Sequence, residues 1–146
     1  MRCMTGTGGR IDPLLLARAS RTLSRRDPRL GAWIRRVGPC GLRRRGDPYT
    51  ALVHAVLHQQ LAGAAAAAIG RRVRFLGQGR FPRPAALLAL RGEALLSAGL
   101  SRRKVATLRA VAEAFSSGHI TTRRLVRMDD AQVVETLTEI NGIGEW

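Results

Sequence analysis

The chain has 146 residues, of which 45% are hydrophobic, and it carries 25 Lys+Arg against 10 Asp+Glu, a formal net charge of +15. This length suits one domain or a small pair of lobes, and the apolar fraction is that of a globular chain, not a disordered one. No apolar run reaches the length of a membrane span, and the first residues lack the apolar core of a signal peptide, so a cytoplasmic protein is expected.

The basic excess lies mainly in the first half of the chain. Residues 1–75 hold fifteen basic and three acidic residues, whereas residues 76–146 hold ten and seven. A field of this sign attracts polyanions, and nucleic acid is the commonest such partner. Lys104 is the only lysine, so codon bias explains part of the arginine content, but it does not explain the scarcity of Asp and Glu. Charge alone therefore favours nucleic-acid binding.

The N-terminal region is expected to be a disordered segment followed by helices. Residues 1–12 are rich in Gly and Thr and are predicted to fray, and a helical domain is predicted over 13–146. Apolar residues recur at helical spacing from Pro13 onwards, and again around Trp33.

A connector at 38–48, broken by Gly and Pro, leads to the next helices. Asp47 and Pro48 suit the N-cap and first turn of a helix with the apolar stripe Leu52, Val53, Val56, Leu57 and Leu61. The alanine-rich segment 62–77 follows. Its small side chains and continued apolar stripe favour a helix packed close to a neighbour over a low-complexity segment.

The rest of the chain predicts further helices of modest length. Two short ones are expected at 84–90 and 92–98, and Ser101 is a suitable N-cap for a longer one that Gly118 ends. A short helix from Thr121 or Thr122 precedes a last helix, capped by Asp129 or Asp130, with the apolar face Val133, Val134, Leu137 and Ile140. No segment alternates with period two, so the predicted fold class is all-α.

The closing sequence LTEINGIGEW contains a tight turn with two glycines. Glycine adopts positive φ and permits close backbone approach, and unpaired amides at the start of a following helix attract anions. The turn is therefore either an ordinary link between helices or a phosphate-binding hairpin. The pattern alone favours the ordinary link, and the basic charge of the chain favours the hairpin.

A second notable stretch is AVLHQQLAG at 55–63, where two glutamines end an apolar helix. They either face solvent, which the stretch alone favours, or reach into a duplex to contact bases or fill a gap. His54 and His58 share a helix face, but no third ligand is evident, so a metal site is not favoured.

Three segments, in this order and at these separations, resemble the helix-hairpin-helix DNA glycosylases, and within them the DNA-3-methyladenine glycosylase II family. They are DPYTALVHAVLHQQLAGAAAAAIGRRV, AGLSRRKVATLRAVAEAF and LTEINGIGEW. The resemblance covers residues 27–146. It implies a helical glycosylase-type domain that is incomplete at its C-terminus.

The resemblance implies roles for the hairpin. The backbone amides of Gly142 and Gly144, on either side of Ile143, would bind a DNA phosphate. The carbonyls of Thr138, Ile140 and Gly142 would lie where family members hold a monovalent cation. No other cofactor is implied.

It also implies roles for four side chains. Gln60 would enter the gap left by a flipped nucleotide, with Gln59 beside it, and Trp146 would line the pocket for the base. An aromatic ring stacks well on an electron-poor alkylated base. Lys104 matches a basic position near the DNA backbone or in a structural ion pair.

The sequence departs from the family at two points. Ala62 stands where the family usually has Ser, which removes a helix cap. The catalytic aspartate is expected beyond Trp146, and Asp129 and Asp130 fit helix-capping roles instead. No catalytic residue is therefore assigned, and the 146 residues alone are predicted to be inactive.

The resemblance implies base excision repair, in which alkylated bases such as 3-methyladenine are hydrolysed from double-stranded DNA. The expected protein is monomeric, makes no membrane contact and is associated with a bacterial-type nucleoid. The alternative is a non-enzymatic helix-hairpin-helix module that binds DNA but needs neither a catalytic acid nor the glutamine.

Overall fold

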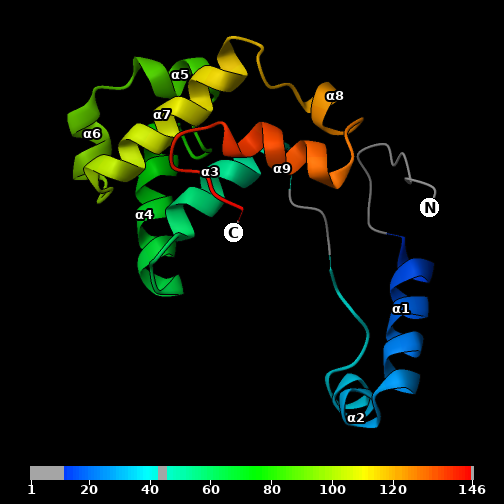
Figure 1. Cartoon of the computed structure of the whole chain (residues 1–146). Coiled ribbons are helices and arrows are strands. Elements are labelled where there is room, and N and C mark those ends of the chain that lie inside the picture. Colours follow the sequence, from blue (N-terminus) through cyan, green and yellow to red (C-terminus); the bar gives the residue numbers. More distant parts are fainter. Residues whose placement is uncertain (1–11, 43–45, 146) are drawn as a thin grey trace. The chain divides into compact units, whose positions relative to one another are not determined.

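The computed structural model describes residues 12–42 and 46–145, and the regular elements in these residues are all helices (Figure 1), which confirms the all-α prediction. The helices are α1 (Pro13–Arg26), α2 (Pro28–Val37), α3 (Pro48–His58), α4 (Gly63–Leu76), α5 (Pro84–Ala89), α6 (Gly92–Ser97), α7 (Arg102–Ser116), α8 (Thr122–Leu125) and α9 (Asp130–Thr138). They divide between two compact units, whose described parts are 12–42 and 46–145. Residues 1–11 lie outside the described residues, and the predicted domain boundaries remain predictions.

The unit formed by residues 12–42 is a pair of helices, α1 and α2. Asp12 and Asp27 cap them through their carboxylates, each with a proline in the first helical turn. The helices approach closely at Gly31, where an added Cβ would lie 2.9 Å from the carbonyl oxygen of Ser24. Most apolar side chains of the pair are exposed: Leu14, Leu15, Leu23, Leu30, Trp33 and Val37.

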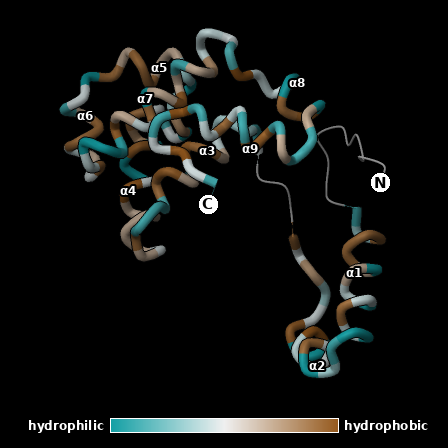
Figure 2. Tube along the Cα trace, in the orientation of Figure 1, coloured by the Kyte–Doolittle hydropathy of each residue, from teal (hydrophilic) through white to brown (hydrophobic). Residues whose placement is uncertain are grey.

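The unit formed by residues 46–145 has a hydrophobic core centred on α7, which packs against α3, α5 and α6. Apolar segments of these helices converge in Figure 2. The largest fully buried side chains are Leu57, Leu87, Leu95, Leu108, Ile120, Val53, Val56, Val73 and Val111. Because α7 packs against three of its neighbours, it is the central helix of this unit.

Two sequence-based details of this core are wrong. Leu61 was expected on the apolar stripe of α3, but α3 ends at His58 and Leu61 is 38% exposed. Val134 was expected on the inner face of α9, but it is 42% exposed. Thr136 is buried in its place, because the face that meets the core follows i, i+3, i+4 spacing from Val133 and excludes the next residue.

The alternative caps are resolved by side-chain hydrogen bonds. Thr121 caps α8, its hydroxyl accepting from the Arg124 amide. Asp129 caps α9 in a reciprocal capping box with Gln132. Both carboxylates that could have been mistaken for catalytic acids therefore lie at the start of α9, and Asp129 is engaged by the backbone.

A buried tyrosine fastens the start of α3 to the loop after α4. The Tyr49 hydroxyl donates to the Pro82 carbonyl at 2.9 Å, and its ring meets Phe115 edge-on at 5.5 Å between centroids. Burial, helped by the charge of Asp47, raises the pKa of Tyr49 well above its usual range. The phenol therefore stays neutral and remains a donor.

Asp47→Ala is expected to lower the free energy of unfolding by about 1 kcal/mol at pH 7, because the carboxylate caps α3 by accepting from the Thr50 amide and hydroxyl. Burial tends to raise the pKa of Asp47, but the hydrogen bonds from Thr50 hold it below its ordinary value of 3.8. A lowered folded-state pKa means that this stabilisation is present above about pH 4 and is lost as the pH falls further. Urea unfolding at pH 7 and pH 3 measures it.

Asp47→Asn is the matched control, since asparagine keeps an acceptor at the N-cap but does not titrate. Its stability relative to the wild type should improve as the pH falls. An equal deficit of the Ala variant at both pH values would contradict the assignment of the cap to the charged carboxylate.

Candidate nucleic-acid interface

The two glutamines occupy the turn between α3 and α4. Gln59 is the C-cap of α3, and Gln60 follows it with φ +54°, in the left-handed region. The turn closes with a hydrogen bond of 3.4 Å from the Leu61 amide to the His58 carbonyl. The Gln60 side chain is exposed, and within the described residues it makes no hydrogen bond.

The conformation of Gln60 is unusual for its residue type. The position just after a helix C-cap commonly takes glycine, because a side chain in the left-handed region costs about 1–2 kcal/mol. The exposed Gln60 side chain does not recover this energy by packing. A strained, exposed residue is a candidate for contact with a ligand. Gln78 is also exposed and left-handed, but only the turn of Gln60 is joined to the glycine hairpin, through Gln59.

Lys104 lies near the start of α7 and reaches the end of α3. Its ammonium group donates to the Leu57 carbonyl at 2.8 Å, and partial burial lowers the pKa of Lys104. The partner is thus a backbone carbonyl and not the carboxylate of an ion pair. Contact of Lys104 with the DNA backbone remains a prediction.

The glycine hairpin follows α9 and rests on α7. The Ile143 amide donates to the Ile140 carbonyl at 3.0 Å and closes the turn, in which Gly142 has φ +90°. A Cβ added at Gly142 would overlap the hydroxyl of Thr107, a buried residue of α7. At Gly144 nothing lies within 4 Å of an added Cβ. Only the first glycine is therefore required by packing.

The hairpin contains two backbone donors without an internal partner in the part of the chain that the structure describes. Among the described residues, no internal hydrogen bond uses the amides of Gly142 or Gly144, and Gly144 is exposed. Two amides in a glycine turn without internal acceptors are suited to binding an anion. The roles predicted for Gly142, Ile143 and Gly144 at a phosphate stay predictions.

The three carbonyls predicted for a monovalent cation are in different situations. The Ile140 carbonyl accepts from Ile143, and the Gly142 carbonyl accepts from the Gln59 side-chain amide at 3.4 Å. The carbonyl of Thr138 belongs to the last residue of α9, whose hydroxyl donates to the carbonyls of Val134 and Glu135. Each carbonyl oxygen has a second lone pair, so cation binding stays a prediction.

Residues far apart in sequence thus meet at one place. The hydrogen bond from Gln59 to Gly142 joins the glutamine turn to the hairpin, and Figure 1 shows the loop after α9 beside α3 and α7. Sequence reasoning singled out both segments but missed Thr107, because a threonine on the inner face of a helix carries no signal of its own. Trp146 lies outside the described residues.

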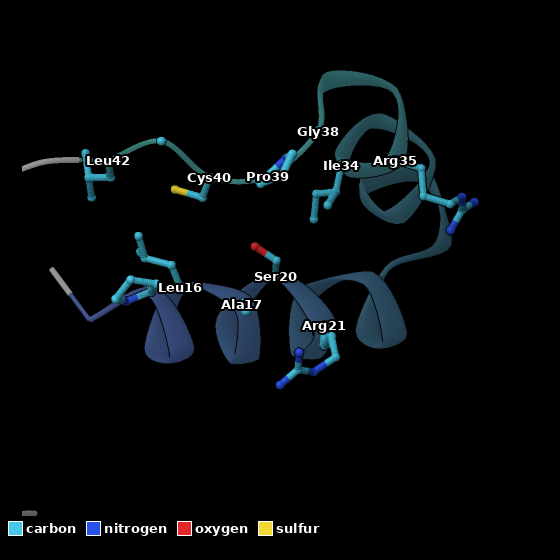
Figure 3. Close-up of a pocket in the computed structure, with 12 residues that line it drawn as sticks. Leu16, Ala17, Ser20, Arg21, Ile34, Arg35, Gly38, Pro39, Cys40 and Leu42 are labelled. Carbon is cyan, nitrogen blue, oxygen red and sulfur yellow. The ribbon is translucent and has the colours of Figure 1, made fainter.

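Two clefts lie away from these residues. In the unit of 12–42, a cleft of about 550 Å³ separates Leu16, Ala17 and Ser20 of α1 from Cys40 and Leu42 (Figure 3). In the unit of 46–145, a cleft of about 950 Å³ surrounds the loop after α4, and its lining includes Arg74, Arg80, Arg83, Tyr49, Phe81 and Phe115.

The His54 and His58 rings stack at 4.1 Å between centroids. In the part of the chain that the structure describes, no group of three or more His, Cys, Asp or Glu side chains could hold a metal ion. None of the helices described is both long and apolar enough to cross a membrane.

Comparison with known proteins identifies the fold. Residues 53–146 match the model of the HhH-GPD superfamily base excision DNA repair proteins. The chain is 38% identical over 102 residues to DNA-3-methyladenine glycosylase 1 of Schizosaccharomyces pombe, covering 68% of this chain and 45% of that protein. It is 28% identical over 134 residues to the alkylbase DNA glycosidase-like protein mag2 of the same yeast, covering 88% and 63%.

Solved structures of DNA glycosylases also match this chain. The 3-methyladenine DNA glycosylase of S. pombe in complex with abasic DNA matches with a TM-score of 0.81 at 34% identity, over 88% of this chain and 65% of that one. A DNA-3-methyladenine glycosidase from Bacillus halodurans matches with a TM-score of 0.73 at 36% identity, over 86% and 58%. The chain therefore spans about half to two thirds of the length of these relatives.

Proposed function

This chain belongs to the HhH-GPD superfamily of base excision DNA repair proteins, and we propose that its full-length protein is a DNA glycosylase that hydrolyses the N-glycosidic bond of alkylated bases, 3-methyladenine among them. The observation that carries this proposal is the meeting of the strained Gln60 turn with the glycine hairpin, joined by the bond from Gln59 to Gly142. Relatives named for this activity support it.

The roles that we propose for the described residues are to bind the duplex and to open it. The amides of Gly142 and Gly144 would take a phosphate beside the lesion, where backbone donors fix the register without reading sequence. Gln60, exposed and held in the left-handed region, would enter the stack and occupy the space of the flipped nucleotide. Filling that space offsets the loss of stacking and pairing, which favours the extruded base.

The net charge of +15 supports duplex DNA as the partner, because arginines release counterions from the phosphates as they bind. Trp146 would stack on the extruded base, and a carboxylate would stabilise the cationic sugar as the base departs. No described residue is assigned that catalytic role. We further infer a monomeric, cytoplasmic protein that works on nucleoid DNA, with a monovalent cation at the hairpin carbonyls.

The full-length protein is expected to release methylated purines, 3-methyladenine first, from duplex DNA treated with a methylating agent. The measurement is chromatography of the released free bases, with unmethylated duplex as the control for background depurination. Absence of release together with retained DNA binding would contradict the proposal and favour the alternative, a non-enzymatic helix-hairpin-helix module, which shares the hairpin but has no use for a strained glutamine.

A further inference from the structure

We propose that Lys104 is a positioning residue: it fixes the turn that presents Gln60 by binding the end of α3 from inside the fold, and it does not contact DNA. This inference rests on the proposed function, because it assigns a purpose to the rigidity of the Gln60 turn. It concerns a basic side chain for which the family resemblance implies a place near the DNA backbone or in a structural ion pair.

Lys104 takes part in the hydrogen bonds at the end of α3. A helix leaves its last carbonyls without internal partners, and together they carry a partial negative charge. Here the Ala55 carbonyl accepts from the Gln59 amide at 3.0 Å, and the His58 carbonyl accepts from Leu61 at 3.4 Å. The Leu57 carbonyl accepts from the Lys104 ammonium at 2.8 Å. Lys104 therefore supplies both a donor and a complementary charge to this helix end.

The hydrogen bonds that hold the turn differ in length. The hydrogen bonds on either side of Gln60 are long: 3.4 Å from Leu61 to His58, and 3.4 Å from the Gln59 side chain to Gly142. The bond from Lys104 is the shortest of the three, and hydrogen bonds from a charged donor are about twice as strong as neutral ones. A left-handed glutamine persists only where its surroundings enforce it, and Lys104 makes the shortest of the hydrogen bonds described at this helix end and turn.

Lys104 lies on the helix that also supports the hairpin, α7. One helical turn further along, Thr107 meets Gly142 of the hairpin. A single rigid helix, anchored in the core by Leu108 and Val111, thus contacts both the glutamine turn and the hairpin. Because Lys104 and Thr107 are fixed relative to one another, α7 sets the separation between the gap-filling side chain and the phosphate site.

The test is the salt dependence of DNA binding, together with the single-turnover rate of base release, for Lys104→Met in the full-length protein. A lysine that binds a phosphate contributes about 0.9 to the slope of log K against log salt concentration. We expect Lys104→Met to keep the wild-type slope and the wild-type affinity for undamaged duplex, and to slow base release by about tenfold. That loss should disappear in a Gln60→Ala background, since Lys104 acts through Gln60.

Arg103→Met is the matched control, because it removes one charge from the neighbouring, exposed position of α7. Lys104→Arg retains a cationic donor and should restore part of the lost rate. A slope that falls by about one for Lys104→Met, with binding weakened equally on all duplexes, would overturn the proposal in favour of a phosphate contact. An unchanged rate of base release would overturn it as well.

Hydrogen exchange on the protein without DNA separates this inference from the proposed function. Amides of residues 57–61 should exchange faster in Lys104→Met and at the wild-type rate in Arg103→Met, whether or not the protein releases any base. Unchanged exchange at 57–61 in Lys104→Met would contradict the positioning role even in an active glycosylase.

Discussion

Gly142→Ala is expected to lower the free energy of unfolding by about 2–5 kcal/mol and to weaken DNA binding. The added Cβ would overlap the Thr107 hydroxyl, and overpacking of this kind costs about 1–3 kcal/mol. The backbone of Gly142 has φ +90°, and an L-residue forced into positive φ adds about 1–2 kcal/mol. Urea unfolding measures the stability, and duplex binding at a fixed salt concentration measures the effect on the hairpin.

Gly144→Ala is the matched control in the same hairpin. Nothing lies within 4 Å of a Cβ at Gly144, and this glycine does not have positive φ. Its stability should stay within about 0.5 kcal/mol of the wild type, as for most exposed substitutions. Any loss of DNA affinity in this variant would then arise from steric overlap between the added methyl group and the bound phosphate. Equal destabilisation by both variants would contradict the seating of the hairpin on Thr107.

Gln60→Gly is expected to separate stability from activity. Glycine adopts the left-handed region freely, so the free energy of unfolding should be unchanged or higher by up to about 1 kcal/mol. The variant loses the side chain proposed to fill the gap. If the duplex with the extruded base is thereby less stable by ~1.4 kcal/mol, base release slows about tenfold. Thermal unfolding and the single-turnover rate of base release measure the two effects.

Gln78→Gly offers an unusually close control. Gln78 is an exposed glutamine with φ +55°, nearly the same backbone conformation as Gln60. It lies just past the opposite end of α4, a helix of 14 residues and therefore about 20 Å long. It should show the same gain in stability without loss of base release. A slower reaction in both variants, or in neither, would contradict the assignment of gap filling to Gln60.

The helices could be predicted from sequence because their signals are local. Apolar spacing, N-cap residues such as Asp47 and Ser101, and breakers such as Gly118 act within a few residues of each helix end. The two errors in the core are of different kinds. Leu61 was placed inside a helix that ends before it, and Val134 was placed on the buried face of α9, although it is exposed. Where a helix ends and which of its faces is buried depend on the neighbouring helices, and local periodicity defines both only to within a few residues.

Some features of the candidate site could be predicted from sequence and others could not. The sequence itself determined an all-α chain with a strong positive charge, a glutamine pair at a helix end and a two-glycine turn, because composition and local propensity suffice for these features. Only the tertiary structure decided that Gln59 bonds to Gly142, 83 residues away, and that Lys104 caps α3. Such contacts arise from the packing of α7 against distant segments. A side chain that bonds to a carbonyl far away in the sequence produces no pattern in the residues around it, so it cannot be predicted from them.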